Sequence, residues 1–539
     1  MLRFLSPIGW SAVLLSSLAT AQHHAGGPAG PEKPVALYKG LGAWHHPIAT
    51  KNAEAQKFFD QGLSLLFGFN RYEALRSFRK AAELDPQSVM ARWGMAMAQG
   101  PYINMDGDPS FDPKGACAAV AAGQKITGAP ERERDYLKAV ATRCPEYKPD
   151  AYIAAMRDLA ARYPDDLDAQ TILAESLMIP VRWHWYSSDG TPAKGVPECE
   201  RILEGVLRRW PEHPGANHYY IHAVESSPTP ERAIASAQRL MGVVPSVGHM
   251  VHMPGHIWLV LGDWGQAAVV NERAAQVDRE YYASTGVAPG SYTPYYIHNV
   301  HFILYARMMQ GHKAETLRAA QTMSEAAAPL VQAIPEIADA FVPVPWLAHA
   351  RFGDWDPVLK TPAPPANLHA ATAVWHYVRA LAFIARGDRA AAAKERAEFE
   401  QIKTHTPPDA QAGQSKAIDI LTIAAEVMDA RVAATPAAAV PHWRKAVEAQ
   451  DKLVYDEPPD WYYPVRESLG AALLRAGNAA EAEQVFREGV KRSPRNGRML
   501  FGLMESLKAQ SKSEAAESVR REFDAVWKTS DVKLRIEDL

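Results

Sequence analysis

The stretch of sequence that decides the fold is residues 55–86, "AQKFFDQGLSLLFGFNRYEALRSFRKAAELDP". Its small and aromatic residues recur at the spacing expected of two short helices joined by a turn. The set is Phe58, Gly62, Ala74, Phe78, Ala81 and Pro86. Small residues let the first helix approach the second closely, aromatic side chains fill the groove between them, and the proline ends the second helix. The stretch therefore predicts a helix–turn–helix unit.

The same scheme returns near the C-terminus, in residues 463–494, "YPVRESLGAALLRAGNAAEAEQVFREGVKRSP". The matching residues there are Gly470, Ala482, Phe486 and Pro494. Between these two units, residues 256–274 and 376–397 carry the same glycine turn between two helical periods. Such self-similarity is the signature of tetratricopeptide (TPR) repeats. We therefore predict an all-α fold, a TPR-like right-handed α-solenoid from about residue 50 to 530, without a β-sheet domain.

Composition narrows the class of function. Hydrophobic residues make up 47% and charged residues 22% of the 539-residue chain, as in ordinary folded soluble proteins. The net charge of −3 implies no basic face, so nucleic acid is not an expected partner. No serine or cysteine nucleophile motif, phosphate loop or HExxH motif is present, which disfavours non-metal hydrolases and nucleotide enzymes.

The N-terminus reads as a secretory signal peptide, residues 1–21. Arg3 is the basic flank, an apolar stretch follows, and Ala19-Thr20-Ala21 fits a small-x-small cleavage site. No other stretch is long and apolar enough to span a bilayer. We therefore expect a periplasmic or secreted protein.

The rest of the chain divides by its repeats. The predicted segments are an N-terminal extension (22–50), N-terminal TPR-like repeats (51–210), central histidine-rich repeats (211–330) and C-terminal repeats (331–530). Three cysteines form no metal-type cluster. In an oxidising compartment they allow one disulfide, with Cys117 and Cys144 the nearest pair in sequence; the alternative is that they are small buried residues.

Histidines are concentrated in the central repeats. Of the 19 in the chain, eight lie between His213 and His301, where an even scatter would place about three. Residues three, four and seven apart share one face of a helix. Seven of the eight fall into groups with that spacing: His218 and His222; His249, His252 and His256; His298 and His301. Because each group precedes a turn and a second helical segment, we assign it to the first helix of a repeat, which faces the concave side.

The phasing of the three groups predicts that all seven histidines converge in one cavity and bind metal. Packed imidazoles without metal would have to stay neutral and find hydrogen-bond partners, or repel one another. The alternative is that they are solvated or core histidines. Pro254-Gly255 interrupts the middle group, so either the helix is kinked there or it begins at Pro254, with His249 and His252 on the preceding loop.

The ligand type favours copper, with zinc second, because imidazole-rich and carboxylate-poor sites suit these metals. Seven histidines exceed the three or four ligands of one zinc ion, whereas two copper ions with three histidines each would use six. Diiron sites in helical bundles need several carboxylates, and Glu225 is the one obvious candidate. Glu225 and Tyr219 are the predicted catalytic side chains, with Glu225 or the seventh histidine orienting a ligand or accepting a proton.

Aromatic side chains surround these groups. We expect a peptide, protein or small-molecule substrate in the concave groove, against Tyr219, Trp183 or Trp375. The competing interpretation is that these aromatic residues are core. A TPR array is also a scaffold for partner proteins by default.

The motifs "ANHYYIHAVE", "GHMVHMPGHI", "HNVHF" and "WHYVRA" together resemble a family of secreted bacterial TPR-repeat proteins to which no reaction is assigned. The resemblance runs from about Trp44 to the C-terminal repeats. Two positions depart from it: Arg71 stands where a histidine is expected, and Tyr102 stands where asparagine is usual. These two departures put a ligand role of the first repeats in doubt and do not concern the seven central histidines.

Two classes of function follow from the sequence. The first is a secreted metalloenzyme on a TPR scaffold, either a copper-dependent oxidase or oxygenase or a zinc hydrolase. The second is a binding scaffold whose histidines hold a structural metal, or a copper carrier. An enzyme needs an open coordination position, whereas a structural site is closed.

Overall fold

The computed structural model describes residues 33–105, 108, 110–287 and 292–539. The predicted signal peptide and residues 22–32 of the extension lie outside the described residues. No helix in the described part combines the length and apolar character that a membrane crossing requires.

Helices follow one another along the whole described chain. The N-terminal helices are α2 (Ala53–Phe67), α3 (Arg71–Leu84), α4 (Val89–Gln99), α5 (Pro113–Gln124), α6 (Glu131–Ala141), α7 (Pro149–Arg162), α8 (Leu167–Met178), the 3-10 turn η2 (Ile179–Val181) and α9 (Val196–Arg209). The central helices are α10 (Pro214–Glu225), η3 (Pro230–Ala233), α11 (Ile234–Val243), α12 (Gly248–His252), α13 (Pro254–Val260), α14 (Trp264–Thr285), α15 (Thr293–Met309) and α16 (Lys313–Ala327).

The C-terminal part continues the series. Its helices are α17 (Leu330–Ala333), α18 (Pro335–Phe341), α19 (Val344–Arg351), α20 (Trp355–Lys360), α21 (His369–Ala385), α22 (Arg389–His405), α23 (Ala417–Val432), α24 (Pro436–Gln450), α25 (Arg466–Arg475), α26 (Ala479–Arg492), α27 (Gly497–Ala509), α28 (Ser513–Trp527) and η4 (Ile536–Asp538). Between α22 and α23, β1 (Gln411–Ala412) and β2 (Ser415–Lys416) form a short antiparallel hairpin.

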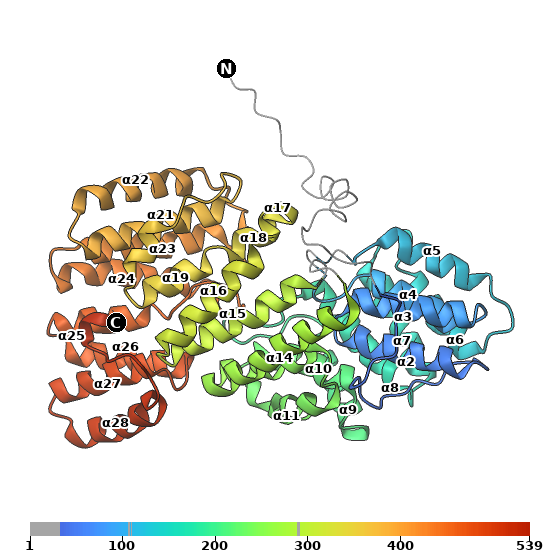
Figure 1. The fold of residues 1–539 in the computed structure, drawn as a ribbon. Helices are drawn as coiled ribbons and strands as arrows, with labels where there is room; N and C mark the ends of the chain where they lie inside the picture. The colour runs from blue at the N-terminus through green and yellow to red at the C-terminus, as the bar shows by residue number, and fades with distance from the viewer. Residues whose placement is uncertain (1–32, 106–107, 109, 288–291) are drawn as a thin grey trace.

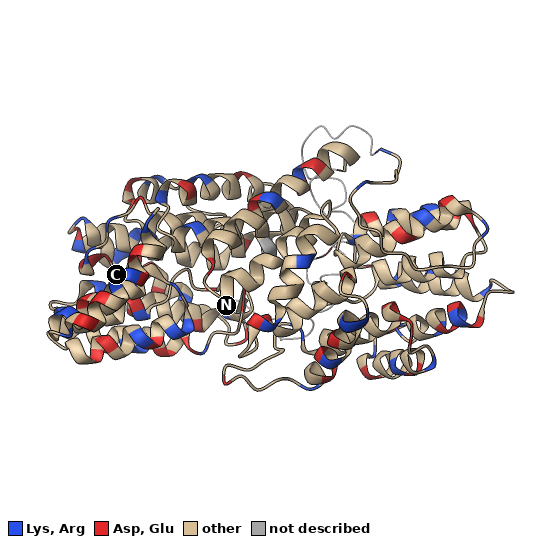
Figure 2. Ribbon diagram, turned by 90° about the horizontal axis from the view of Figure 1, so that it is seen from below, with Lys and Arg blue, Asp and Glu red and all other residues tan. Residues whose placement is uncertain are grey.

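The predicted all-α solenoid is confirmed. In Figure 1 the blue and cyan helices α2–α8 lie at one end, the orange and red helices α21–α28 lie at the other, and α14–α16 run between them. Figure 2 shows acidic and basic residues interspersed along the helices at both ends.

One phenylalanine wedge holds each terminal repeat together, as the sequence pattern predicts. A Cβ atom on Gly62 would meet the ring of Phe78 at 2.7 Å, and one on Gly94 would meet it at 2.4 Å. The ring of Phe486 lies in the same way against Gly470 and Gly502, at 2.5 and 2.1 Å from the positions their Cβ atoms would take. Glycine at these positions is therefore required for the close approach of consecutive helices.

The turn inside a repeat needs a residue in the left-handed conformation. Gly262, between α13 and α14, has φ 72°, and Gly477, between α25 and α26, has φ 87°. In the first repeat the same place, one residue before the cap of the second helix, is taken by Phe69 at φ 57°. A non-glycine residue there is strained, and such strain persists only when the surroundings impose it.

The central helices join the two largest apolar cores. The N-terminal core extends to Ile257 of α13, and the C-terminal core begins at Leu259 of the same helix. Helix α13, which carries His256, therefore lies at the junction of the two cores.

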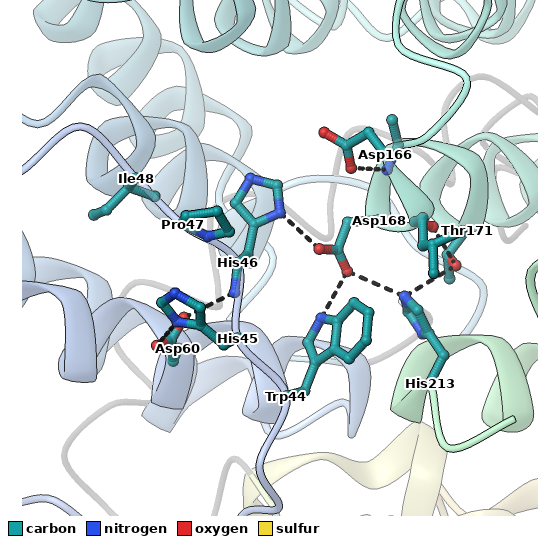
Figure 3. A network of polar contacts seen from close by, with 12 residues as sticks. Trp44, His45, His46, Pro47, Ile48, Asp60, Asp166, Asp168, Thr171 and His213 are labelled. Atoms are coloured by element: carbon teal, nitrogen blue, oxygen red, sulfur yellow. Dashed lines mark hydrogen bonds and ion pairs between the residues drawn. The ribbon is translucent and has the colours of Figure 1, made fainter. Parts of the chain in front are cut away.

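The described part of the N-terminal extension is anchored by a buried carboxylate. The two oxygens of Asp168 accept hydrogen bonds from the indole of Trp44 at 3.0 Å and from Nδ1 of His46 at 2.6 Å (Figure 3). His213, the cap of α10, lies with Nε2 3.2 Å from the same carboxylate. The ring of His213 also lies 4.2 Å from that of Trp44, so this histidine of the central repeats packs against the extension.

The disulfide between Cys117 and Cys144 links α5 to the segment after α6, with the Cα atoms 5.6 Å apart. Cys199 is free and buried.

Candidate metal centre

Each histidine group lies on the first helix of a pair. His218 and His222 are on α10, which α11 follows; the middle group is on α12 and α13, which α14 follows; His298 and His301 are on α15, which α16 follows. The five histidines of the first two groups are buried, while His298 and His301 are half-buried. The assignment of the groups to first helices thus agrees with the structure.

The group of His249, His252 and His256 combines the two arrangements that the sequence allowed, a continuous but interrupted helix and a helix that begins at Pro254. His249 and His252 are helical, in α12, and α13 begins directly afterwards at Pro254 with His256 two residues on. Two glycines let α14 approach this segment. A Cβ atom on Gly248 would lie 1.8 Å from Oδ1 of Asp278, and one on Gly255 would lie 2.4 Å from Nδ2 of Asn271.

The first triad consists of His218, His222 and His249. One ring nitrogen of each lies within 4.8 Å of those of the other two. Nε2 of His218 is 3.1 Å from Nε2 of His249. Nε2 of His222 is buried and has no hydrogen-bond partner. Buried polar atoms in proteins normally have a partner, and a metal ion could bind this nitrogen.

The second triad consists of His252, His256 and His298, again with ligand atoms within 4.8 Å of one another. Nε2 of His252 lies 2.6 Å from Nε2 of His256. The ring of His298 is 4.8 Å from that of His252 and 6.1 Å from that of His256.

The two triads adjoin each other. The rings of His222 and His256 are 5.3 Å apart, and those of His249 and His252 are 5.5 Å apart. Dinuclear sites hold their metal ions about 3.5–4 Å apart, which ligand sets in ring contact can accommodate. Six of the seven predicted ligands are therefore arranged as two adjacent sets of three.

The other ring nitrogen of several histidines is held by the protein. Nδ1 of His218 lies 2.5 Å from the carbonyl oxygen of Phe67, and Nδ1 of His252 lies 2.6 Å from Oδ1 of Asn271. A hydrogen bond from Nδ1–H fixes the tautomer and leaves Nε2 as the metal-binding atom. The sequence patterns contain no signal for Phe67 or Asn271 as partners, because neither lies in a histidine motif.

Two carboxylates hold Nδ1 of His222 and His256, whereas Nδ1 of His249 is buried without a hydrogen-bond partner. Glu225 accepts from His222 at 3.0 Å through Oε1 and from His256 through Oε2. Glu457 Oε1 lies 3.1 Å from Nδ1 of His256. Sequence reasoning missed Glu457, which stands in "EPPDWYYP" before α25; its aromatic neighbours drew attention, but its carboxylate did not.

The charges of these groups follow from their surroundings. Burial lowers the pKa of His256, but the carboxylates of Glu225 and Glu457 outweigh it and raise that pKa to about 10. Burial tends to raise the pKa of Glu225, while the charges of His256 and His222 lower it below its usual value. Without metal, the centre therefore holds a carboxylate–imidazolium pair next to neutral rings.

The other rings of the triads favour the neutral form. Burial, and then the positive charge of neighbouring histidines, lowers the pKa of His218, His249, His252 and His298 well below the ordinary value. A metal binds neutral imidazole, so these rings are in the binding form at neutral pH without giving up a proton.

One phenylalanine packs against each triad. The ring of Phe69 is 4.5 Å from that of His218 and 5.1 Å from that of His249. The ring of Phe302 is 4.6 Å from that of His252 and 5.0 Å from that of His298. These contacts supply the surroundings that impose the left-handed backbone of Phe69, and they keep water from one side of each triad.

The remaining predicted site residues lie in different places. His301 belongs to neither triad, and its ring lies 6.2 Å from that of Phe341. Tyr219 is buried with its ring 5.2 Å from that of His218, but its hydroxyl is hydrogen bonded to Glu175. The structure thus directs the reactive atom of Tyr219 toward Glu175.

The two predicted aromatic platforms differ in position. Trp183 lies with its ring 6.3 Å from that of His222, and Trp185 lies with its ring 5.7 Å from it. Trp375 lies on α21, where its indole donates to the carbonyl of Thr361 at 3.1 Å. Trp183 is therefore next to the first triad, whereas the contacts of Trp375 are with the C-terminal repeats.

The two residues that depart from the family resemblance contact each other. The guanidinium of Arg71 lies 3.9 Å from the centre of the Tyr102 ring. Nη2 of Arg71 is 3.5 Å from Glu175, and the Tyr102 hydroxyl is 3.3 Å from that of Tyr295, whose ring is 4.8 Å from His249. These two positions form one packed unit beside the first triad.

Neither a protein-family model nor a curated protein matches the chain, so the family resemblance stays a prediction. Among solved structures, the human IFIT1 dimer with m7Gppp-AAAA is similar at 12% identity and a TM-score of 0.32, over 89% of this chain and 91% of that chain. The APC/C hetero-tetramer Cut9-Hcn1 is similar at 12% identity and a TM-score of 0.31, over 90% of this chain and 89% of that chain. At these TM-scores the two likenesses carry no argument about this chain.

Proposed function

We propose that this protein is a TPR-solenoid metalloprotein that binds two copper ions, one in each histidine triad, and acts as an oxidase or oxygenase. The observation that carries the proposal is the division of six histidines into two adjacent sets of three, with Glu225 hydrogen bonded to one member of each. The predicted signal peptide supports a periplasmic or secreted location for this activity.

The donor set supports copper ahead of zinc. All six ligand positions are imidazoles, which suit copper and zinc and are poor ligands for magnesium or calcium. The six histidines form two equal sets of three, which match two ions with three protein ligands each and differ from a single structural zinc ion with four. A pair of copper ions would supply electron transfer between dioxygen and an organic substrate.

The side chains around the triads would keep the histidine rings in fixed positions. Asn271 and Glu225 fix ring orientation, and Phe69 and Phe302 exclude water. His298 is the one triad histidine that is half-buried, and Tyr295, next to His249, is half-buried too. A substrate would approach from the side of these two residues, with its reacting group near His298.

Metal analysis of the purified protein tests the proposal. The protein is depleted of metal, reconstituted separately with copper and with zinc, and analysed for bound metal and for oxygen consumption with phenols and peptides. Two copper ions per chain and oxygen consumption only in the copper form are expected. One tightly bound zinc ion, with no oxygen consumption by either form, would overturn it.

A second candidate is a scaffold with a structural or carrier metal site, or a zinc-dependent hydrolase. It is favoured by the burial of five of the six triad histidines, because a closed site is typical of a structural metal. Chelation separates the two. A structural metal would unfold the central repeats when removed, whereas a copper enzyme would stay helical by circular dichroism and lose only its oxygen consumption.

A further inference from the structure

The N-terminal extension contacts the beginnings of two helices that carry histidines of the first triad. The carbonyl of Gly40 accepts a hydrogen bond from the backbone N–H of Ser246 at 3.1 Å, two residues before α12 begins. Four residues further along the chain, the ring of Trp44 lies 4.2 Å from that of His213, which caps α10 (Figure 3). Residues 40–46, named the strap, therefore connect the start of α10 to the start of α12.

Both contacts of the strap are closely fitted. Gly42 has φ 82°, and a Cβ atom on it would lie 2.6 Å from the carbonyl oxygen of Val243, at the end of α11. At the other contact, the buried carboxylate of Asp168 accepts from Trp44 at 3.0 Å and from Nδ1 of His46 at 2.6 Å. Four residues of chain span at most about 14 Å. The starts of α10 and α12 therefore stay near each other while both contacts hold.

The first triad lies between these two helices. His218 and His222 come from α10 and His249 from α12, and each is at most 2% exposed. Nε2 of His218 is 3.1 Å from Nε2 of His249, across the two helices. An ion from solvent therefore reaches these nitrogen atoms only when α10 and α12 move apart. Such local opening costs less free energy than unfolding of the whole protein.

We propose that the strap controls the uptake and loss of metal at the first triad. While both contacts hold, α10 and α12 enclose the three histidines; release of either contact lets the helices part and admits or frees an ion. This regulation rests on the metal binding of the proposed function. The second triad is less affected, because His256 and His298 come from α13 and α15.

Hydrogen exchange of the metal-depleted full-length protein measures the opening itself. In Gly42→Ala the added methyl group meets the carbonyl of Val243, which favours the released strap. Exchange of residues 214–222 and 248–252 should become at least about tenfold faster, while α21–α28 keep their rates. Gly128→Ala is the matched control, because Gly128 has a φ of 80° and no described atom lies within 4 Å of the place its Cβ would take.

Copper exchange then connects the opening with the metal. Copper(II) is added to the same metal-depleted proteins, and its uptake is followed by quenching of tryptophan fluorescence. Its loss is followed by transfer to a chelator. Gly42→Ala should take up and lose one of its ions at least about tenfold faster than Gly128→Ala and the unmodified protein, with the same number of ions bound per chain.

Unchanged hydrogen exchange in α10 and α12 of a folded Gly42→Ala variant, or equally fast exchange in Gly128→Ala, would overturn the proposal. Copper rates that stay the same while the helices open more readily would also overturn it. An unmodified protein that binds neither copper nor zinc would instead overturn the proposed function, and the role of the strap in metal uptake with it.

If Gly42→Ala does not fold, Trp44→Phe replaces it in both experiments. That variant keeps an aromatic ring against His213 but loses the indole N–H that Asp168 accepts, so exchange and copper rates should rise in the same direction. His45→Gln is its control, because His45 belongs to the strap but has an exposed side chain that contacts Asp60. Equal rates in these two variants would overturn the proposal.

Discussion

Glu225 and His256 lie 31 positions apart, on α10 and α13, and the carboxylate of the first accepts a hydrogen bond from Nδ1 of the second. The other oxygen of Glu225 accepts from Nδ1 of His222, on its own helix. His222 belongs to one triad and His256 to the other. A single carboxylate therefore fixes the orientation of one ring in each triad, and it links the two triads.

Glu225→Gln should weaken metal binding at one of the two triads. The glutamine amide offers one acceptor and one donor, so one of the two imidazoles would have to accept at Nδ1 and carry its proton on Nε2, where it cannot bind metal. Loss of such a supporting carboxylate typically costs about 10–100-fold in metal affinity. Competition titration with a chelator of known affinity measures it.

Glu204→Gln is the control for that experiment, because Glu204 pairs with Arg232 outside the triads. Copper affinities that agree between Glu225→Gln and Glu204→Gln would show that Glu225 does not support the centre.

The seven histidines should not be equivalent. His222→Ala and His252→Ala each remove one ligand from a different triad, and each should lose copper and activity while the helical content stays unchanged. His301→Ala should keep two ions, because His301 belongs to neither triad. Elemental analysis and circular dichroism measure the two effects. Loss of an ion from His301→Ala would place His301 among the ligands.

Phe69 should matter through its ring and not through its backbone. Phe69→Gly relieves the strain of a non-glycine residue in the left-handed conformation, which is worth about 1 kcal/mol of stability. It also removes a buried ring that packs on His218 and His249, which costs about 3–5 kcal/mol. Net destabilisation is expected. Ser511→Gly is the control for the backbone effect, because Ser511 also has a left-handed φ of 56° but its side chain is exposed. The free energy of unfolding of Ser511→Gly should rise by up to about 1 kcal/mol. Urea denaturation compares them, and stabilisation by Phe69→Gly would contradict the packing argument.

The anchor of the N-terminal extension should weaken as pH rises above neutrality. Burial lowers the pKa of His46, but the hydrogen bond and charge of Asp168 outweigh it and raise that pKa above its ordinary value. The stability that His46 contributes is therefore present below the unfolded pKa of about 6.5 and is lost as pH rises through the folded pKa. Asp168 has a lowered pKa, so its own contribution is present above about 3.9 and is lost as pH falls below it.

The measurement is hydrogen exchange of residues 44–48 and the free energy of unfolding between pH 5 and 9, for the unmodified protein and for His46→Gln. The stability difference between the two proteins should shrink as pH rises. His405→Gln, which changes an exposed histidine of α22, is the control. A difference between unmodified protein and His46→Gln that grows with pH would be opposite to the expected sign.

Reduction of the Cys117–Cys144 disulfide should lower the free energy of unfolding by about 3 kcal/mol, because the bond closes a loop of 27 residues in sequence separation. The double variant Cys117→Ser, Cys144→Ser should behave like the reduced protein. Cys199→Ala, which changes the free cysteine, should stay sensitive to reductant. Denaturation curves with and without reductant measure this, and coincident curves would show that the disulfide does not stabilise the fold.

The repeating pattern of the sequence was sufficient to predict the class of fold. The wedge positions Gly62, Phe78, Gly470 and Phe486 carry the same contacts in the structure that their spacing implied, because a repeat is stabilised mainly by neighbours close in sequence. Helical spacing also predicted which histidines share a face. These features depend on residues close together in the sequence, so the periodicity of the sequence predicts them.

The sequence also determined that the histidine-bearing helices lie next to one another, because consecutive repeats stack. Only the tertiary structure decided how the seven rings divide. His298 and His301 have the spacing of one face, yet packing directs His298 to the second triad and His301 toward Phe341. The separation depends on the rotation of α15 against its neighbours, which side-chain packing sets and periodicity does not.

The partners that hold the rings were decided by tertiary structure as well. Glu457 reaches His256 from just before α25, and Asn271 reaches His252 because Gly248 and Gly255 let α14 lie close to α12 and α13. Each contact joins residues on separate elements, so it exists only when helix axes reach their final distance and rotation. The sequence pattern predicts which residues share a face of a helix. The distance between the faces of two helices depends on the volume of the side chains packed between them.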